Sequence, residues 1–252
     1  MAPRRCLRQT SKPEKVHPTS VESEEEAMMP VPEAALAEDR YAFVRDYLAR
    51  LPAAPGESVL FDVGAGALPM REHVEKAGYA WFGFDLHPKS PEVVEWDINT
   101  RFEGDQRADV VLLMDVIEHT YNPGLAMENI VRVLKPGGRI IMTMPNPKWS
   151  RARTMHMYSG FLACFTQHDL DVNHHVFTTW PHIVLKLVLD CGLKLERYVT
   201  LDRDEVKPKA LGLMTPVLAV EGLIRSAIEM RDPTARGMSY AFVARLDTGE
   251  AV

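Results

Sequence analysis

Asp115, Glu118 and His119 are the side chains of this chain best suited to acid–base or metal chemistry. They follow an apolar run that ends at Met114, and if a helix begins there, their spacings of three and four put them on one side of it. Such a set could bind a divalent cation, and hard oxygen ligands suit Mg²⁺. We favour another interpretation, in which Glu118 caps or pairs locally and His119 lines a pocket as a base or substrate-orienting group. His119 is therefore a catalytic candidate, and a divalent cation bound by Asp115, Glu118 and His119 is the alternative.

A second group of imidazoles lies between His168 and His182. His174 and His175 are adjacent, so in an extended segment their side chains point to opposite sides and at most one faces a given site. One of them could be a general base, because imidazole exchanges a proton near physiological pH. We expect most of these histidines to be exposed or structural, and we keep His174 and His175 as catalytic candidates.

A glycine-containing turn, Asp62-Val-Gly-Ala-Gly-Ala-Leu-Pro69, follows the first apolar strand. Glycines at the carboxyl end of a strand let the backbone turn tightly and approach a ligand closely. The third glycine of the dinucleotide fingerprint is absent, which counts against NAD because a pyrophosphate needs a close helix N-terminus. A cofactor without phosphates would not need that glycine.

Acidic residues follow the next two strands. Asp85 lies about 20 residues past the glycines, where a carboxylate can accept both hydroxyls of a ribose. The alternative for Asp85 is an Asp that caps a turn before Pro88. Asp97 and Ile98 follow the third strand, where a polar acceptor could meet an adenine amino group.

The elements that must position these residues alternate along the chain. Apolar runs that predict strands cover residues 58–63, 80–85, 92–96, 108–114, 139–144, 193–201 and 238–246. Helices are predicted at about 36–51, at 69–76 with a proline in the first turn, at 123–134, at 180–190 and within 210–230. Continuous apolar strands separated by helices indicate an α/β fold, doubly wound and mostly parallel, with helices on both faces of the sheet.

Composition excludes several classes of protein. The chain has 252 residues, 46% of them hydrophobic, which suits one large α/β domain. A formal net charge of −6 argues against a broad basic surface for nucleic acid. The three cysteines, Cys6, Cys164 and Cys191, form no CxxC pair, so neither a disulfide framework nor a cysteine zinc site is indicated, and we expect a reduced cytoplasmic location. We expect no secretory signal, because no apolar region follows Arg4, Arg5 and Arg8, and we expect no membrane association, because no run of about 18 apolar residues is present.

Two segments stand outside the alternation. Residues 1–31 are rich in Pro, Ser, Lys and Glu, and we expect them to be disordered because they cannot bury enough apolar surface. Residues 32–252 are then the folded domain. Within it, residues 146–180 carry many aromatic and histidine side chains, and we predict that this lid segment covers the substrate.

Taken in order, these features resemble the class I, Rossmann-like, S-adenosylmethionine-dependent methyltransferases. Asp109-Val-Val-Leu-Leu-Met-Asp-Val-Ile-Glu-His-Thr120 is similar to that superfamily's fourth strand and its end, and Arg132-Val-Leu-Lys-Pro-Gly-Gly138 to the turn before its fifth strand. Met144-Pro-Asn146 is similar to the end of the fifth strand. The resemblance covers about residues 33–246, and it departs from the commonest pattern in the loop from Gly64 to Arg71.

The resemblance implies a seven-stranded sheet with an antiparallel C-terminal strand, and S-adenosylmethionine as cofactor. It assigns the methionyl part to Gly64 and Gly66, the ribose to Asp85, and the adenine to Asp97 and Ile98. The full expected cofactor set is Asp62, Gly64, Ala65, Gly66, Asp85, Leu86, Asp97, Ile98, Met114, Asp115, Val116 and His119.

Within the superfamily, Asp115, Glu118 and His119 resemble the E-x-x-E-H cluster of the ubiquinone-biosynthesis O-methyltransferases, which implies Mg²⁺. Here an Asp, one methylene shorter, replaces the first Glu. His175-Val-Phe-Thr178 is similar to a common helix-entry motif, with Thr178 or Thr179 as the N-cap.

The expected activity is O-methylation of a hydroxyl group on a small biosynthetic molecule. Methylation of nitrogen or carbon, and a non-catalytic binding protein, are the alternatives. The expected partner is the small-molecule substrate, with neither nucleic acid nor membrane, and a homodimer is an open alternative.

Overall fold

The computed structural model describes residues 39–67, 69–204 and 215–247, and every structural statement below concerns these residues. The segment predicted to be disordered and the first residues of the first predicted helix lie outside them.

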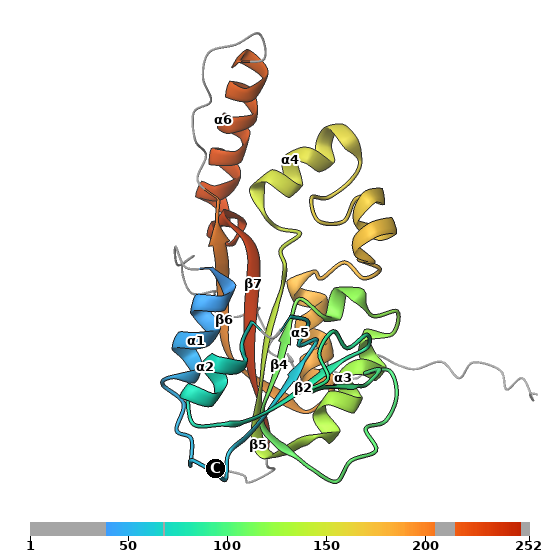
Figure 1. The fold of residues 1–252 in the computed structure, drawn as a ribbon. Coiled ribbons are helices and arrows are strands. Elements are labelled where there is room, and N and C mark those ends of the chain that lie inside the picture. Colours follow the sequence, from blue (N-terminus) through green and yellow to red (C-terminus); the bar gives the residue numbers. More distant parts are fainter. Residues whose placement is uncertain (1–38, 68, 205–214, 248–252) are drawn as a thin grey trace, which may run out of the picture. The chain divides into compact units, whose positions relative to one another are not determined.

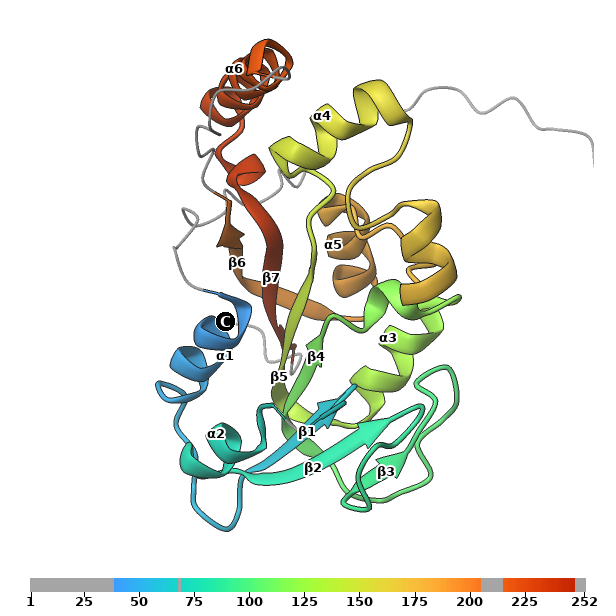
Figure 2. The same ribbon diagram turned by 45° about the horizontal axis from the view of Figure 1, so that its top comes forward.

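A seven-stranded sheet is the centre of the described domain, in the order β3-β2-β1-β4-β5-β7-β6 (Figures 1 and 2). Its strands are β1 (Val59–Val63), β2 (Ala80–Asp85), β3 (Val93–Glu95), β4 (Ala108–Met114), β5 (Leu134–Pro145), β6 (Leu193–Arg203) and β7 (Gly237–Leu246). Strands β1 to β5 pair in parallel, whereas β7 runs antiparallel to both β5 and β6. The predicted fold class is confirmed, including the antiparallel C-terminal strand.

Helices cover both faces of this sheet. The α-helices are α1 (Arg40–Leu48), α2 (Arg71–Lys76), α3 (Pro123–Arg132), α4 (Ser150–Ser159), α5 (Pro181–Asp190) and α6 (Thr215–Arg231). Shorter turns are η1 (Ile117–His119), η2 (Asp169–Asn173) and η3 (Pro233–Arg236). Helices α1 and α2 contact one another, α3 and α5 contact one another, and the two pairs lie on opposite sides of the sheet (Figure 2).

The apolar residues of α1 explain why it packs on the sheet. Phe43, Val44 and Leu48 are buried, and they share one core cluster with Leu60 of β1 and Leu112 of β4. Asp39 begins the helix, because its carboxylate accepts a hydrogen bond from the Ala42 N–H at 2.7 Å. The described helices include none that is long and apolar enough to cross a membrane.

Several predicted boundaries differ from the structure, and three of the differences concern the caps and pairing of the elements. Helix α2 begins after Met70, so Pro69 lies before the helix and not in its first turn. Strand β5 begins at Leu134, well before residue 139, because its first residue already pairs with Ala108 ahead of a register shift. Helix α5 has Trp180 as its N-cap without a side-chain hydrogen bond, so neither Thr178 nor Thr179 caps it.

Candidate active site at the carboxyl edge of the sheet

The backbone of the turn that follows β1 lies against Val116, just after the end of β4. Gly64 has φ 80° and Gly66 has φ 50°, the left-handed region that side chains rarely adopt. The N–H groups of Gly64 and Ala65 both donate to the carbonyl of Phe84, at 2.8 and 3.0 Å, which fixes the turn against β2. A Cβ on Gly64 would lie 2.4 Å from Cγ2 of Val116. Glycine is therefore required here for close approach as well as for conformation.

Asp85, at the end of β2, is held facing this turn. One carboxylate oxygen accepts the Gly66 N–H at 3.0 Å, and the other accepts the His87 N–H at 2.9 Å. The turn-capping role that was the alternative for Asp85 is thus present. Each carboxylate oxygen has more than one lone-pair site, so Asp85 can also accept hydrogen bonds from a ligand. The neighbouring Leu86 is half exposed at 50%.

The turn after β3 is organised by two side chains. Oδ1 of Asp97 accepts from the Asn99 backbone N–H at 2.8 Å and from the Asn99 side-chain amide at 3.1 Å. Ile98 is buried, and its carbonyl accepts from the side-chain amide of Asn129 on α3 at 2.9 Å. Asn129 holds this turn in place and was not among the residues predicted from the sequence.

Asp62 is the fourth residue of β1 and precedes the turn. Its side chain is buried, and its carboxylate accepts from the Trp81 indole N–H at 3.1 Å. Burial raises the pKa of Asp62 to about 6, against the opposing effect of the Trp81 hydrogen bond.

The end of β4 is tied to α1 and β6 by an ion-pair network. Met114 is partly buried, and Asp115, which follows it, has φ 54°. The Asp115 carboxylate pairs with the Arg40 guanidinium and accepts from the Thr143 hydroxyl at 3.2 Å. Nε of Arg40 also lies 3.1 Å from an oxygen of Asp202. The carboxylate of Asp115 is thus occupied by protein groups.

Glu118, His119 and His175 come together just beyond Asp115. One potential ligand atom from each lies within 4.8 Å of the others, and we call this set the Glu118–His119–His175 cluster. Glu118 is fully buried, and among the described residues neither of its carboxylate oxygens has a hydrogen-bond partner. The expectation that Glu118 caps or pairs locally was therefore wrong. Burial raises the pKa of Glu118 well above its usual range.

Backbone hydrogen bonds join η1 to the segment that carries His175. The carbonyl of Glu118 accepts from the N–H groups of Val176 and Phe177 at 2.9 and 3.0 Å. As a result the rings of His119 and His175 lie 4.9 Å apart, centroid to centroid, at 74°. His174 is exposed, and it is the residue with left-handed backbone angles that ends η2. Of the two adjacent histidines, His175 is therefore the one beside His119.

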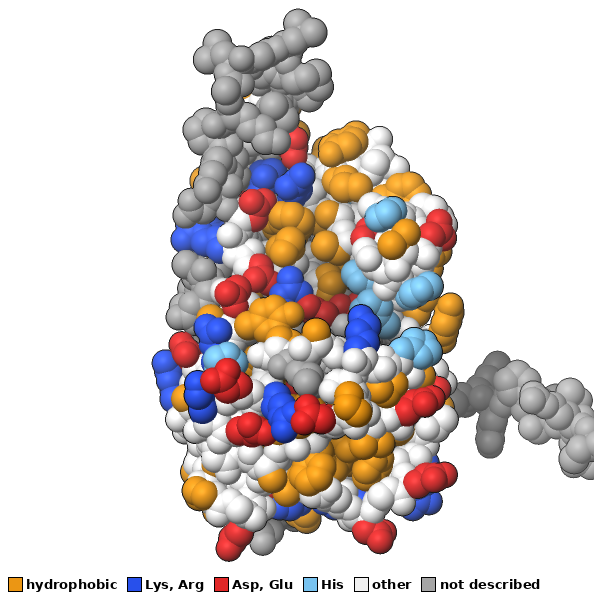
Figure 3. Space-filling view, viewed as in Figure 1, with side chains coloured by type: hydrophobic (Ala, Val, Ile, Leu, Met, Phe, Trp, Pro, Cys, Tyr) orange, Lys and Arg blue, Asp and Glu red, His pale blue; other side chains and the backbone are white. Residues whose placement is uncertain are grey.

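The hydrogen bonding of His175 defines its free nitrogen. Nδ1 of His175 lies 2.6 Å from the carbonyl of Cys164, and a carbonyl only accepts, so Nδ1 carries the hydrogen. In the neutral ring, Nε2 is then free to accept a proton or bind a cation. His119 is an exposed residue, but partial desolvation of its ring, together with the neighbouring His175 ring, lowers its pKa. Figure 3 shows histidine and acidic side chains gathered in a hollow between the sheet and the α4 segment.

Both ends of the lid segment are anchored to the sheet. The hydroxyl of Thr179 donates to the Pro145 carbonyl at 2.7 Å, and the hydroxyl of Tyr240 donates to the Thr179 carbonyl at 2.9 Å. Thr179 therefore connects the lid segment to β5 and β7.

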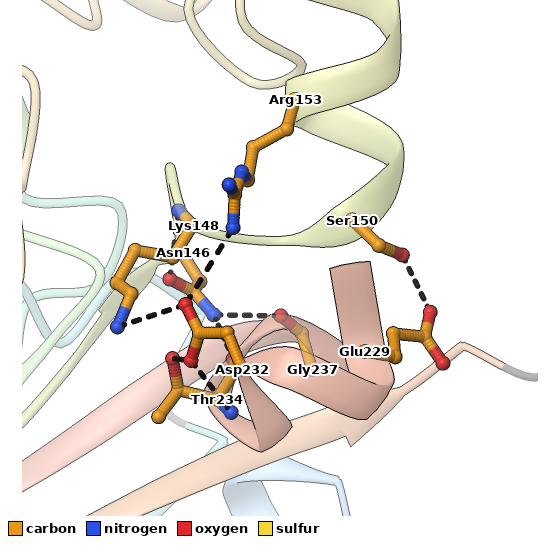
Figure 4. A network of polar contacts seen from close by, with 8 residues as sticks. All are labelled: Asn146, Lys148, Ser150, Arg153, Glu229, Asp232, Thr234 and Gly237. Atoms are coloured by element: carbon orange, nitrogen blue, oxygen red, sulfur yellow. Dashed lines mark hydrogen bonds and ion pairs between the residues drawn. The ribbon is translucent and has the colours of Figure 1, made fainter. Parts of the chain in front are cut away.

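Close to α4, the network in Figure 4 fixes the other end. The Asn146 amide donates to the carbonyls of Thr234 and Gly237 at 2.9 Å, and Asp232 lies 3.2 Å from Nζ of Lys148. The far end of α4 and the residues after it are apolar and exposed, at Met157, Tyr158 and Phe161.

A model of the methyltransferase domain family matches residues 36–186. The chain belongs to this family. One curated relative, the ubiquinone biosynthesis O-methyltransferase of Caulobacter vibrioides, is 33% identical over 120 residues, which cover 41% of this chain and 46% of that protein. An uncharacterized methyltransferase of Mycobacterium leprae is 26% identical over 155 residues, which cover 56% of this chain and 52% of that protein. The chain thus spans about half the length of these curated relatives.

Solved methyltransferase structures share the fold. An S-adenosylmethionine-dependent methyltransferase from Archaeoglobus fulgidus has a TM-score of 0.56 at 17% identity, covering 81% of this chain and 94% of that one. The [4+2]-cyclase SpnF has a TM-score of 0.51 at 16% identity, covering 82% of each chain. A fold that also carries a cyclase does not by itself fix a reaction, so the reaction of this methyltransferase domain must be argued from its site.

Proposed function

We propose that this chain transfers a methyl group from S-adenosylmethionine to a hydroxyl group of a small molecule. The observation that carries the proposal is the position of the Glu118–His119–His175 cluster. Glu118 and His119 follow β4, and β4 pairs in parallel with β1, so the cluster and the glycine turn share the carboxyl edge of the sheet. Ligands of open α/β sheets bind at this edge.

The residues of the turn fit S-adenosylmethionine. Left-handed glycines at Gly64 and Gly66 leave the backbone without side chains at the end of β1. Asp85 is held by two backbone N–H groups and keeps acceptor capacity for ribose hydroxyls. Asp97 and Ile98 would border the adenine, and no phosphate-binding helix terminus is needed.

Methyl transfer requires an acceptor oxygen in line with the methyl carbon. As the oxygen–carbon bond forms, the carbon–sulfur bond breaks and its electron pair stays on sulfur, giving S-adenosylhomocysteine. The hydroxyl proton must leave, and Nε2 of His175 or a ring nitrogen of neutral His119 can accept it. The remaining rate enhancement would come from orientation of the acceptor and from exclusion of water by the lid segment.

Two observations favour oxygen over nitrogen or carbon as the acceptor. A neutral amine already presents a lone pair, whereas a hydroxyl is a poor nucleophile until it loses its proton, so a pair of imidazoles is of most use to a hydroxyl. The Caulobacter vibrioides relative is also named an O-methyltransferase. A non-catalytic binding role would leave the histidine pair and the buried Glu118 without a purpose.

The test is to identify the methylated product. The full-length chain is incubated with S-adenosylmethionine carrying a deuterated methyl group and with matched phenols, catechols and anilines. Mass spectrometry should find the label on oxygen. Label on nitrogen or carbon, or no transfer by a chain that binds S-adenosylhomocysteine, would contradict the proposal.

A further inference from the structure

We propose that Glu118, His119 and His175 form a binding site for a divalent transition ion of the zinc type, and that Asp115 is not among its ligands. This differs from the Mg²⁺ set of Asp115, Glu118 and His119 that the sequence resemblance implies. The inference deepens the proposed function, on which its catalytic meaning rests, but the binding itself does not depend on methyl transfer.

The buried carboxylate of Glu118 is the first argument. Its side chain is 0% exposed, and among the residues described neither oxygen has a hydrogen-bond partner. A buried charged or polar group without a partner is strongly unfavourable, so such groups are paired or coordinate metals. The Glu118 carboxylate lies beside two imidazoles. A cation bound by all three groups would compensate the cost of burying this carboxylate.

The second argument is the geometry of the donors. One atom from each residue lies within 4.8 Å of the other two, so modest side-chain rotation brings all three within bonding distance of one ion. Nδ1–H of His175 donates to the Cys164 carbonyl at 2.6 Å, which orients the ring and leaves Nε2 as the donor atom. Metal-binding histidines almost always donate their other N–H in this way.

The donor types select the metal. Two imidazoles and one carboxylate suit zinc and its transition-metal neighbours, whereas Mg²⁺ prefers oxygen ligands throughout. Asp115, the oxygen ligand that would favour Mg²⁺, is paired with Arg40 and bonded to Thr143.

Three protein ligands would leave a coordination position open. An ion bound by these three residues would replace the imidazole base of the proposed function, because it would lower the pKa of a coordinated hydroxyl so that the hydroxyl proton leaves to solvent. His175 comes from the lid segment and Glu118 with His119 from η1, so the site exists only when these two segments are together. The backbone hydrogen bonds from Val176 and Phe177 to the Glu118 carbonyl hold them so.

The test is direct metal binding by the full-length chain, in the absence of cofactor and acceptor. Protein stripped with a chelator is titrated with Co²⁺, whose visible absorption reports its ligands, and then with Zn²⁺ and Mg²⁺. One equivalent of Co²⁺ should bind with intense visible bands, Zn²⁺ should displace it, and Mg²⁺ should not. Wild-type protein that binds neither Co²⁺ nor Zn²⁺, or Mg²⁺ that displaces Co²⁺, would overturn the proposal.

Variants separate the two ligand sets. His175→Ala and Glu118→Gln should each weaken Co²⁺ binding by about 100-fold. The matched control His174→Ala, at the exposed neighbour, should leave binding unchanged, and so should Asp115→Asn. Retention of binding in a folded His175→Ala variant, or its loss in Asp115→Asn, would refute the assignment. A chain that binds Co²⁺ but methylates nothing keeps this site and loses the proposed function, whereas a chain that methylates but binds neither Co²⁺ nor Zn²⁺ keeps the proposed function and loses this site.

Discussion

The guanidinium of Arg40, the first residue of α1, is ion-paired with Asp115 at the end of β4 and with Asp202 near the end of β6. Three elements that are distant in the chain therefore meet at the edge where the candidate active site lies. The side chain of Arg40 is 21% exposed, so these pairs are shielded from solvent more than ordinary surface pairs are.

Replacing Arg40 should destabilise this edge. Arg40→Met leaves the carboxylates of Asp115 and Asp202 without their cation, and we expect a loss of about 1–3 kcal/mol in the free energy of unfolding. Arg50→Met, at an exposed arginine just after α1, is the matched control and should change little. Urea denaturation of both variants makes the comparison, and equal losses would show that the network adds no stability.

The turn after β1 should tolerate no side chain at Gly64. Gly64→Ala combines a positive φ with a Cβ only 2.4 Å from Cγ2 of Val116, and we expect it to cost about 2–4 kcal/mol of stability. Gly56→Ala is the control, since Gly56 has φ 81° but nothing within 4 Å of its Cβ position. Gly56→Ala should therefore lower the free energy of unfolding only by the strain of the positive φ. Thermal denaturation that gives both variants the same loss would argue against the close contact with Val116.

Asp85 should carry much of the cofactor affinity. Asp85→Ala removes a charged acceptor, and binding of S-adenosylhomocysteine should weaken by about 1.5–3 kcal/mol in calorimetric titration. Asp105→Ala, in an exposed loop, should bind normally. The same titration with NAD(H) should show no binding. Unchanged affinity in Asp85→Ala, or micromolar affinity for NAD(H), would contradict the cofactor assignment.

The raised pKa of Asp62 makes the stability of the domain depend on pH. Its pKa is raised from 3.8 to about 6, mainly by burial. The carboxyl group of Asp62 therefore binds its proton more tightly in the folded state than in the unfolded state. The contribution of this difference to stability is fully present below about pH 4 and is lost as the pH rises through about 6.

Asp62→Asn removes this loss, since an amide oxygen can still accept from the Trp81 indole. The free energy of unfolding of the variant, relative to that of wild type, should therefore increase by up to about 3 kcal/mol as the pH rises from about 4 to about 8. Chemical denaturation across this range is the measurement, with Asp46→Asn on the exposed side of α1 as control. A stability difference that does not change with pH would show that Asp62 is not protonated on folding.

Much of the sheet could be predicted from the sequence, because parallel strands buried on both faces appear as continuous apolar runs. The ranges expected for β2 and β4, residues 80–85 and 108–114, match the structure. The edge positions of Gly64, Asp85 and Asp97 followed from the same pattern, since each lies at or just after the carboxyl end of a strand.

Contacts between distant segments could not be predicted. Arg40 and Asp202 are separated by 162 positions, and nothing in either sequence neighbourhood indicates the other. The contact of His175 with His119 depends on the path of the lid segment, which strand and helix patterns do not specify. The resemblance to a helix-entry motif implied Thr178 or Thr179 as a helix cap, but in the folded chain the hydroxyl of Thr179 donates to the Pro145 carbonyl instead.

The comparison of His119→Ala with wild type tests the central claim, methyl transfer at this edge, most directly. His119 lies beside His175, and the main polar contacts expected for the cofactor lie elsewhere, at Asp85 and Asp97, so the variant should largely retain its affinity for S-adenosylhomocysteine. Its turnover with a hydroxyl acceptor should fall by about 100-fold or more, whether His119 removes the proton or binds a metal. Near-normal turnover in a folded His119→Ala variant would contradict the account.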